Sequence, residues 1–207
     1  MLHSSARRPC ALTVAAVCLL LLATGCSEEK KATPEPSPTP ISSLNTAAMQ
    51  VPRIEFCGLV PDAAVSDALG GKAKSDAAYG NGDVQRVAGV GQDVVHEIGC
   101  TWTAEDGSTA KAWVYARPVD AAFARTVVAA SAKKKGCSKV AGPAYGKPST
   151  TQQCEFPDGT QRVRHAGLFG QSWLTCELSS PGTDDASLRS RTDAWCVQVV
   201  NALDTAR

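Results

Sequence analysis

The spacing of its cysteines constrains this chain more than any other feature of its sequence. The 207 residues include nine cysteines, three of them before residue 27. The other six are Cys57, Cys100, Cys137, Cys154, Cys176 and Cys196. No two of these six have the Cys-x-x-Cys spacing of a zinc knuckle or a thioredoxin-like motif, so we expect neither a metal site nor a redox site. An even number of widely spaced cysteines instead predicts disulfides in a chain exported to an oxidising compartment.

The first 26 residues have the pattern of an export signal. Arg7 and Arg8 precede the apolar run 11–23, which is shorter than the roughly 20 residues that a membrane-spanning helix needs. The run ends in residues 22–26, Leu-Ala-Thr-Gly-Cys, which resemble the lipobox of bacterial lipoproteins. In that motif the cysteine is lipidated, for example with palmitate, and becomes the mature N-terminus. An ordinary signal-peptidase site is the alternative, but it would leave Cys26 as a seventh, unpaired thiol. We therefore predict a signal peptide over 1–25, a lipid on Cys26, and a location on the outer face of the cytoplasmic membrane.

Composition divides the remainder into a tether and one domain. Residues 26–50 contain few large apolar side chains, and residues 33–40 alternate proline with polar residues. Such a segment favours an extended, polyproline-like chain, so we predict a disordered spacer over 26–50. From residue 51 valine, leucine and tryptophan recur regularly, which predicts a single domain over 51–207.

Three helices are expected in this domain. Pro61 and the glycines at 70–71 bracket a short apolar stripe, Ala64, Val65, Ala68 and Leu69. Residues 118–135 repeat apolar side chains at helical spacing, namely Val119, Phe123, Val127 and Ala130. Residues 184–205 place Leu188, Trp195, Cys196, Val199 and Leu203 on one face.

Strands are expected between the helices. Asp106-Gly107 separates strands over 100–103 and 110–117, and Asp158-Gly159 separates strands over 151–156 and 160–168. A further strand over 172–179 completes a three-stranded meander. The predicted fold class is therefore α+β, with an antiparallel sheet packed against about three helices. The path of residues 72–99 is not predicted.

Chain order and this topology favour one of the 15 possible disulfide pairings. Cys57–Cys100 would tie the first helix to the sheet, and Cys137–Cys154 would close the loop after the second helix. Cys176 shares a strand face with Leu174 and Leu178, and Cys196 lies on the apolar stripe of the last helix. The bond Cys176–Cys196 would then join helix and sheet.

Several motifs together resemble a family of actinobacterial cysteine-rich lipoproteins of unknown function. They are the lipobox, the proline-rich segment, Phe-Cys-Gly-Leu-Val at 56–60, Leu-Gly-Gly at 69–71 and Gly-Cys-Thr-Trp at 99–102. The resemblance covers most of 51–207 and implies an α+β domain outside the cytoplasm. It implies no catalytic residues.

The charge and the motifs exclude several functions. The net charge is +1, which lacks the strong positive field of a nucleic-acid-binding protein. There is no nucleophile elbow, phosphate loop, zinc-protease motif or dinucleotide fingerprint. We therefore expect no cofactor, no metal and no catalytic residue. An envelope enzyme with an unrecognised site, using His96 or His165, is the alternative.

One face of the sheet is a candidate binding surface. In the strand 110–117, Trp113 and Tyr115 alternate with small inward residues, and Trp173 is expected on the same outer face. Arg162 and Arg164 are expected there too. Aromatic rings between cations suit stacking and charge-assisted hydrogen bonds, unless the tether, residues 72–99 or the first helix covers this face.

These observations predict a non-catalytic, lipid-anchored envelope protein. Its expected partners are the membrane, through the lipid on Cys26, and a wall component, a lipid, a small ligand or another envelope protein. An accessory subunit without a ligand of its own is a further possibility.

Overall fold

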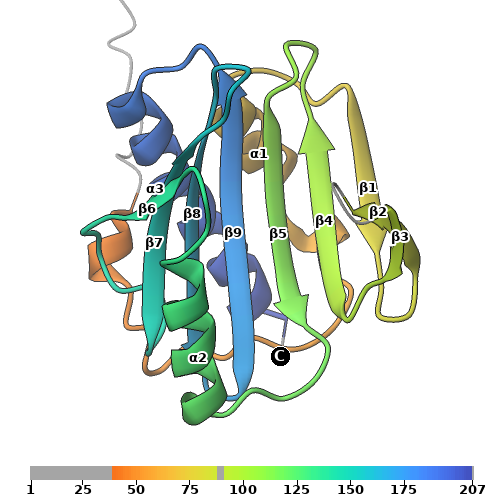
Figure 1. The fold of residues 1–207 in the computed structure, drawn as a ribbon. Helices are drawn as coiled ribbons and strands as arrows, with labels where there is room; N and C mark the ends of the chain where they lie inside the picture. The colour runs from red at the N-terminus through yellow and green to blue at the C-terminus, as the bar shows by residue number, and fades with distance from the viewer. Residues whose placement is uncertain (1–38, 88–90, 207) are drawn as a thin grey trace, which may run out of the picture. The chain divides into compact units, whose positions relative to one another are not determined.

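The fold is that of a computed structural model, which describes residues 39–87 and 91–206. A seven-stranded antiparallel sheet has the strand order β1-β4-β5-β9-β8-β7-β6, and β2 and β3 form a separate hairpin (Figure 1). The sheet strands are β1 (Ser75–Tyr79), β4 (Glu97–Thr103), β5 (Thr109–Tyr115), β6 (Cys137–Lys139), β7 (Ser149–Glu155), β8 (Thr160–Phe169) and β9 (Ser172–Pro181). The hairpin strands are β2 (Val84–Val87) and β3 (Gly91–Val94). The α-helices are α1 (Asp62–Leu69), α2 (Ala121–Ser131) and α3 (Asp185–Asp204), and short 3₁₀ helices are η1 (Ile41–Ser43) and η2 (Cys57–Leu59). The predicted α+β class is confirmed.

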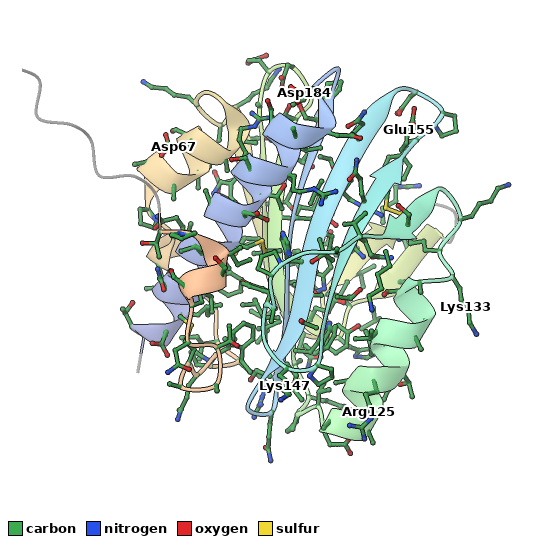
Figure 2. All side chains as sticks on the ribbon, turned by 90° about the vertical axis from the view of Figure 1, so that its left-hand side faces the viewer. Asp67, Arg125, Lys133, Lys147, Glu155 and Asp184 are labelled. Atoms are coloured by element: carbon green, nitrogen blue, oxygen red, sulfur yellow. A yellow bond between two sulfur atoms is a disulfide. The ribbon has the colours of Figure 1, made fainter. Side chains whose placement is uncertain are left out.

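The helices lie on both faces of the sheet, but unequally. Seen nearly edge-on, α1 and α3 lie on one side of the sheet and α2 lies on the other (Figure 2).

The expected helices begin and end at local signals in the sequence. The Asp120 carboxylate caps α2 by accepting a hydrogen bond from the Phe123 N–H at 2.7 Å, and Asp184 caps α3 in the same way. Gly70, at a φ of 73°, ends α1 in a left-handed turn.

The main core lies between the sheet and α1 and α3. The stripes expected on these two helices are buried, and Trp195 of α3 stacks edge-on against Trp102 with ring centroids 5.3 Å apart. The Trp195 indole N–H donates to the Lys111 carbonyl at 3.2 Å. The small residues Ala110 and Ala112 of β5 are fully buried in this core, where α1 packs against β5 and α3 packs against β8 and β9.

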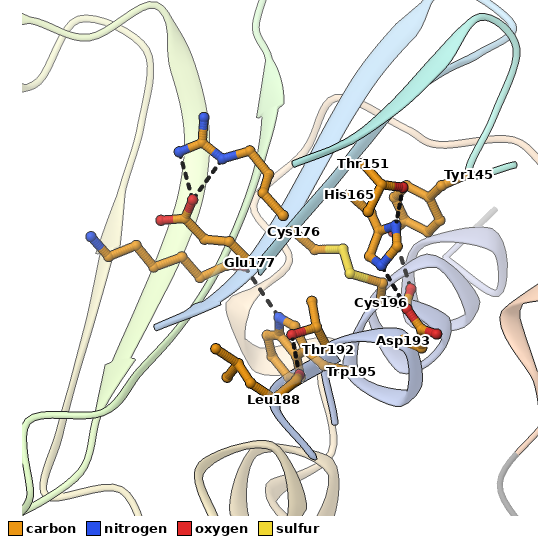
Figure 3. The surroundings of a disulfide bond; sticks show 12 residues. Tyr145, Thr151, His165, Cys176, Glu177, Leu188, Thr192, Asp193, Trp195 and Cys196 are labelled. Atoms are coloured by element: carbon orange, nitrogen blue, oxygen red, sulfur yellow. Dashed lines mark hydrogen bonds and ion pairs between the residues drawn. A yellow bond between two sulfur atoms is a disulfide. The ribbon is translucent and has the colours of Figure 1, made fainter. Parts of the chain in front are cut away.

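The three disulfides join the cysteine pairs expected from the sequence, Cys57–Cys100, Cys137–Cys154 and Cys176–Cys196. Cys176 of β9 and Cys196 of α3 are both fully buried, so their bond fixes the longest helix to the centre of the sheet (Figure 3). Cys137 and Cys154 lie directly opposite each other in the β6–β7 pair.

Two sequence-based boundaries need correction. The expected spacer over 26–50 ends earlier, because Ile41 is buried, Leu44 and Met49 pack against the core, and the Gln50 N–H donates to the Asp204 carboxylate. The folded part therefore includes residues before the expected start at 51. The signal peptide over 1–25 and the lipidation site Cys26 lie outside the described residues.

The unplaced segment 72–99 supplies an edge of the sheet. It forms β1, which pairs with β4, the hairpin β2–β3, and the start of β4 itself. The strand β6 was also not expected. The helix expected over 118–135 is shorter, because α2 ends at Ser131.

We expect loss of the buried disulfide to cost more stability than loss of the β6–β7 disulfide. Their sequence separations are 20 and 17 residues, so the loop-closure contribution is nearly the same, about 3 kcal/mol each. The double variant Cys176→Ala/Cys196→Ala also loses buried sulfur contacts beneath α3, which adds about 1–2 kcal/mol. Urea unfolding of this variant beside Cys137→Ala/Cys154→Ala measures the difference, and equal losses would contradict the role given to the buried bond.

Candidate functional site

The sheet face opposite α3 carries the side chains expected as a binding surface. The strand register places Lys111, Glu177 and Arg164 in one row across β5, β9 and β8. Trp113 lies opposite Thr175 on this same face, and Tyr115 lies two residues further along β5. The register thus places Trp113, Tyr115, Trp173, Arg162 and Arg164 on one face of the sheet. The accessibility of these side chains differs from one to the next.

The two arginines of this face share one carboxylate within the protein. The Arg164 Nε donates to Glu177 Oε2 at 2.7 Å, and the Arg162 Nε lies 3.6 Å from the same oxygen. Each guanidinium also covers an aromatic ring at 5.0 Å from its centroid, Arg164 over Trp113 and Arg162 over Phe156. Only 5% of the Glu177 side chain is exposed. Arg164 is thus paired within the protein, whereas the buried Arg162 Nε, although close to the same carboxylate, makes no hydrogen bond within the described residues. Because both guanidinium groups are held against Glu177 and a ring, this network stabilises the sheet face more than it offers free charges to a ligand.

Trp173 does not belong to an accessible surface, which corrects the sequence interpretation. It is 1% exposed and forms a second core with Val119, Ala124, Ala166 and Leu168 beneath α2. The segment that covers Trp173 is α2, which was not among the three segments expected to cover this face, namely the tether, residues 72–99 and the first helix. Trp113 and Tyr115 are half-buried.

A group of half-buried titratable side chains lies beside Trp113, at the β1–β4–β5 end of this face. Glu97 of β4 pairs in register with Tyr115 of β5, and Tyr79 of β1 pairs with Gly99. A Cβ at position 99 would overlap the Tyr79 ring and the Trp113 side chain, so glycine is needed for these rings to approach the strand. Sequence reasoning missed Glu97 and Tyr79, since neither has a motif that distinguishes it from other strand residues.

Burial perturbs the pKa of each group in this cluster. Burial, reinforced by the nearby Glu177 charge and opposed by Arg164, raises the pKa of the Glu97 carboxyl. Burial and the Glu97 charge likewise raise the pKa of the Tyr115 hydroxyl and, well above its usual range, that of Tyr79. Several titratable groups with perturbed pKa values at one place are typical of functional sites.

A cavity of about 700 Å³ opens directly beside Glu97 and Tyr115. It lies between the base of the β2–β3 hairpin and the connection from β5 into α2. Most of its lining is apolar, including Val94, Val95, Pro118, Val119 and Phe123. Cavities of this size with few polar groups are typical of small-molecule binding sites.

Phe123 has a different place from the one its helical spacing predicted. It was expected on the buried stripe of the second helix, but it is 53% exposed and lines the cavity. The contact face of α2 is instead formed by Ala124, Val127 and Val128. Val94 of β3 is 45% exposed and borders the same cavity. Two exposed large apolar side chains thus border one opening, which marks it as a candidate contact surface for a ligand.

His165, the alternative catalytic residue, lies on the other face of the sheet. Its Nε2 lies 2.7 Å from Asp193 Oδ1, and its Nδ1 lies 3.0 Å from Thr151 Oγ1 (Figure 3). Hydroxyl, imidazole and carboxylate therefore have the order of a nucleophile–base–acid triad. His165 is fully buried, however, and Thr151 is 6% exposed.

The position of Thr151 decides how this triad is interpreted. A Cβ at Gly142 would lie 2.9 Å from Thr151 Oγ1, so the 140–148 loop covers the hydroxyl. A nucleophile must reach its substrate. We therefore assign Thr151, His165 and Asp193 to a buried network that ties β7 and β8 to α3. His96 is exposed and lines the 700 Å³ cavity.

Other site types find no support in the described part of the chain. Within residues 39–87 and 91–206, no cluster of three or more His, Cys, Asp or Glu side chains is arranged to hold a metal ion. Among those same residues, no helix is long and apolar enough to cross a membrane.

Comparison with known proteins shows a likeness to a solved structure. No protein-family model matches the chain, and no curated protein matches it. The extracellular domain of PknH from Mycobacterium tuberculosis is similar in structure, with 13% sequence identity and a TM-score of 0.45. The likeness covers 76% of this chain and 99% of that domain.

The variant Glu97→Gln is expected to be more stable than the parent protein at neutral pH. A carboxyl whose pKa is raised by folding contributes its stability below the unfolded pKa, about 4.3, and loses it as pH rises through the folded pKa. The amide carries no charge, so the advantage of the variant grows above about pH 4 and disappears below it.

Unfolding in urea between pH 3.5 and pH 8 measures this difference. Glu105→Gln is the matched control, because Glu105 is exposed and pairs only with the exposed Lys74, so its removal is expected to change stability by less than about 1 kcal/mol. The opposite result is that the free energy of unfolding of Glu97→Gln, measured relative to the parent, is lower at pH 8 than at pH 4. That result would contradict the prediction, because it would show that the fold stabilises the ionised carboxylate.

Proposed function

We propose that this chain is a binding protein of the cell envelope, anchored by a lipid on Cys26, whose folded domain holds a small, largely apolar ligand. The ligand lies in the cavity between α2 and the β2–β3 hairpin. The observation that carries this proposal is the cavity itself: about 700 Å³, mostly apolar, with Phe123 and Val94 at its opening and a half-buried carboxylate inside. A few polar groups in an apolar cavity are the usual basis of ligand orientation.

Binding is favoured over catalysis by where the reactive groups lie. The buried Thr151–His165–Asp193 network faces α3, whereas the cavity is on the opposite sheet face. His96 lines the cavity, but no hydrogen bond from a described side chain orients its ring, whereas a general base is usually held by a carboxylate or a carbonyl. The cavity therefore has the features of a binding site without an activated nucleophile.

The location outside the cytoplasm is supported by the disulfides. Three disulfides in one domain are typical of proteins that fold in an oxidising compartment, because cytoplasmic reductants keep thiols free. The signal peptide directs export, and the lipobox-like residues 22–26 at its end supply the cysteine that carries the lipid anchor. The likeness of the motifs to cysteine-rich lipoproteins is in accord with this proposal.

Substitution at the cavity opening is expected to weaken binding of a neutral apolar probe. N-phenyl-1-naphthylamine fluoresces when it enters an apolar site, and its titration gives a dissociation constant. Phe123→Asp places a charge where the probe makes apolar contact, so we expect at least about a tenfold increase in that constant, equivalent to about 1.4 kcal/mol.

The control for this titration is Leu59→Asp. Leu59 has a comparable exposure, 45%, but it belongs to η2 and does not line the cavity. We expect its dissociation constant to equal that of the parent protein. Equal probe binding by the parent and Phe123→Asp, or no binding by the parent, would contradict the proposed site.

Loss of Cys26 is expected to release the protein from the membrane. Cys26→Ala removes the sulfur that carries the proposed acyl chain, and the described helices offer no membrane span to replace it. Metabolic labelling with an alkyne fatty acid should mark the parent protein and not the variant, and the variant should leave the membrane fraction. Labelling that persists in Cys26→Ala would contradict the anchor.

A further inference from the structure

We propose that the cavity selects ligands that carry a cationic amine, with the Glu97 carboxylate as the counter-ion and the apolar lining holding the body of the ligand. This inference rests on the proposed function, since it names the class of ligand for the same cavity. It depends on three features of the described residues: the lack of a direct partner for the half-buried Glu97 carboxylate, the aromatic and apolar side chains around it, and the positions of the other charges.

Glu97 is a charge for which the fold supplies no direct partner. It is half-buried on β4, yet among the described residues no hydrogen bond or ion pair within 4 Å ends on its carboxylate. The positive charge that acts on Glu97 is Arg164, and its guanidinium already binds Glu177 and covers Trp113. A half-buried carboxylate without a direct partner is incompletely solvated, and a ligand ammonium would offset that cost through a charge-assisted hydrogen bond.

The surroundings of Glu97 suit a cation with an apolar body. Tyr115 lies beside it in the β4–β5 pair and also lines the cavity, so an ammonium bound at Glu97 would lie close to a tyrosine ring. Val119 and Phe123 continue the lining away from the carboxylate. Among the charged residues that line the cavity, Glu97 is half-buried whereas Asp93 and Arg117 are exposed, and most of the remaining lining is apolar. This arrangement matches an amine attached to an alkyl or aryl group.

The other charges near the cavity do not favour an anion. Arg117 and Asp93, which also line it, are both exposed and of opposite sign. The titratable groups that face or influence Glu97 are Tyr79 of β1, Asp93 of β3, His96, Tyr115 of β5, Arg117, Arg164 of β8 and Glu177 of β9. An anion placed inside would lie beside the half-buried Glu97 carboxylate, whereas Arg117, the arginine in the lining, is exposed to solvent.

Three matched probes test this proposal on the folded protein. 4-Phenylbutylamine, 4-phenylbutanol and 4-phenylbutyrate share one apolar body and differ in the head group, and each is titrated against bound N-phenyl-1-naphthylamine at pH 7.5. We expect the amine to displace the dye at a concentration at least about tenfold lower than the alcohol, and the acid to be the weakest.

The variant Glu97→Gln should remove the preference without removing the cavity. We expect its affinity for the amine to fall to that of the alcohol, while its affinity for the alcohol stays within about twofold of the parent. Glu105→Gln is the matched control, because Glu105 is an exposed glutamate that does not line the cavity, and it should keep the preference. The preference of the parent should also decline as pH falls and Glu97 takes up a proton, while the ammonium stays charged.

The outcomes separate the two proposals. Displacement by all three probes with equal strength, or a preference that survives Glu97→Gln, would overturn the amine class and leave the apolar cavity in place. Tighter binding of the acid than of the amine would also overturn it. Failure of the dye and of every probe to bind would overturn the proposed function together with this inference.

Discussion

The structure depends on how unequally the two faces of its sheet are covered. Seven strands about 4.8 Å apart make a sheet about 29 Å wide, whereas a helix with its side chains is about 10 Å across. The long helix α3, with α1 and the segment around η1, buries one face. On the other face α2 covers a part of β7, β8 and β9, and the rest is filled by the sheet's own side chains (Figure 1). The Arg164–Glu177–Arg162 network, with the rings of Trp113 and Phe156, fills the middle of this face. The cavity lies on the same face, beside β4 and β5.

Local signals in the sequence predicted most of the elements and the covalent cross-links. The stripes of the first and last helices, the Asp-Gly turns and the parity of Cys176 with Leu174 depend only on neighbours in the chain. With the order of the elements known, only few cysteine pairings bring helix and strand ends together, and the three disulfides follow. Alternation along β5 and β9 also placed Trp113, Tyr115 and Trp173 on one face.

The candidate site could not be predicted in the same way, because it is formed by contacts between distant segments. Glu97 becomes a half-buried carboxylate without a direct partner among the described residues only once β1 pairs with β4 and the β2–β3 hairpin closes beside it, and these strands have weak patterns. Helical spacing alone put Phe123 on the buried stripe, since periodicity does not say how far a partner sheet extends beneath a helix. The sequence named His165 only as the residue that an alternative enzyme would use, and the loop that covers Thr151 determines that its network is structural.

Amide chemical shifts recorded during a titration with 4-phenylbutylamine test the central claim, that this domain binds its ligand over β4 and β5. The ¹⁵N–¹H signals report each backbone position separately, so they locate the ligand without assuming a site. The largest chemical-shift changes are expected in residues 93–97 and 115–123, the two segments that line the cavity. Changes centred instead on the hollow beside Cys57 and Trp102, or no change at millimolar amine, would contradict it.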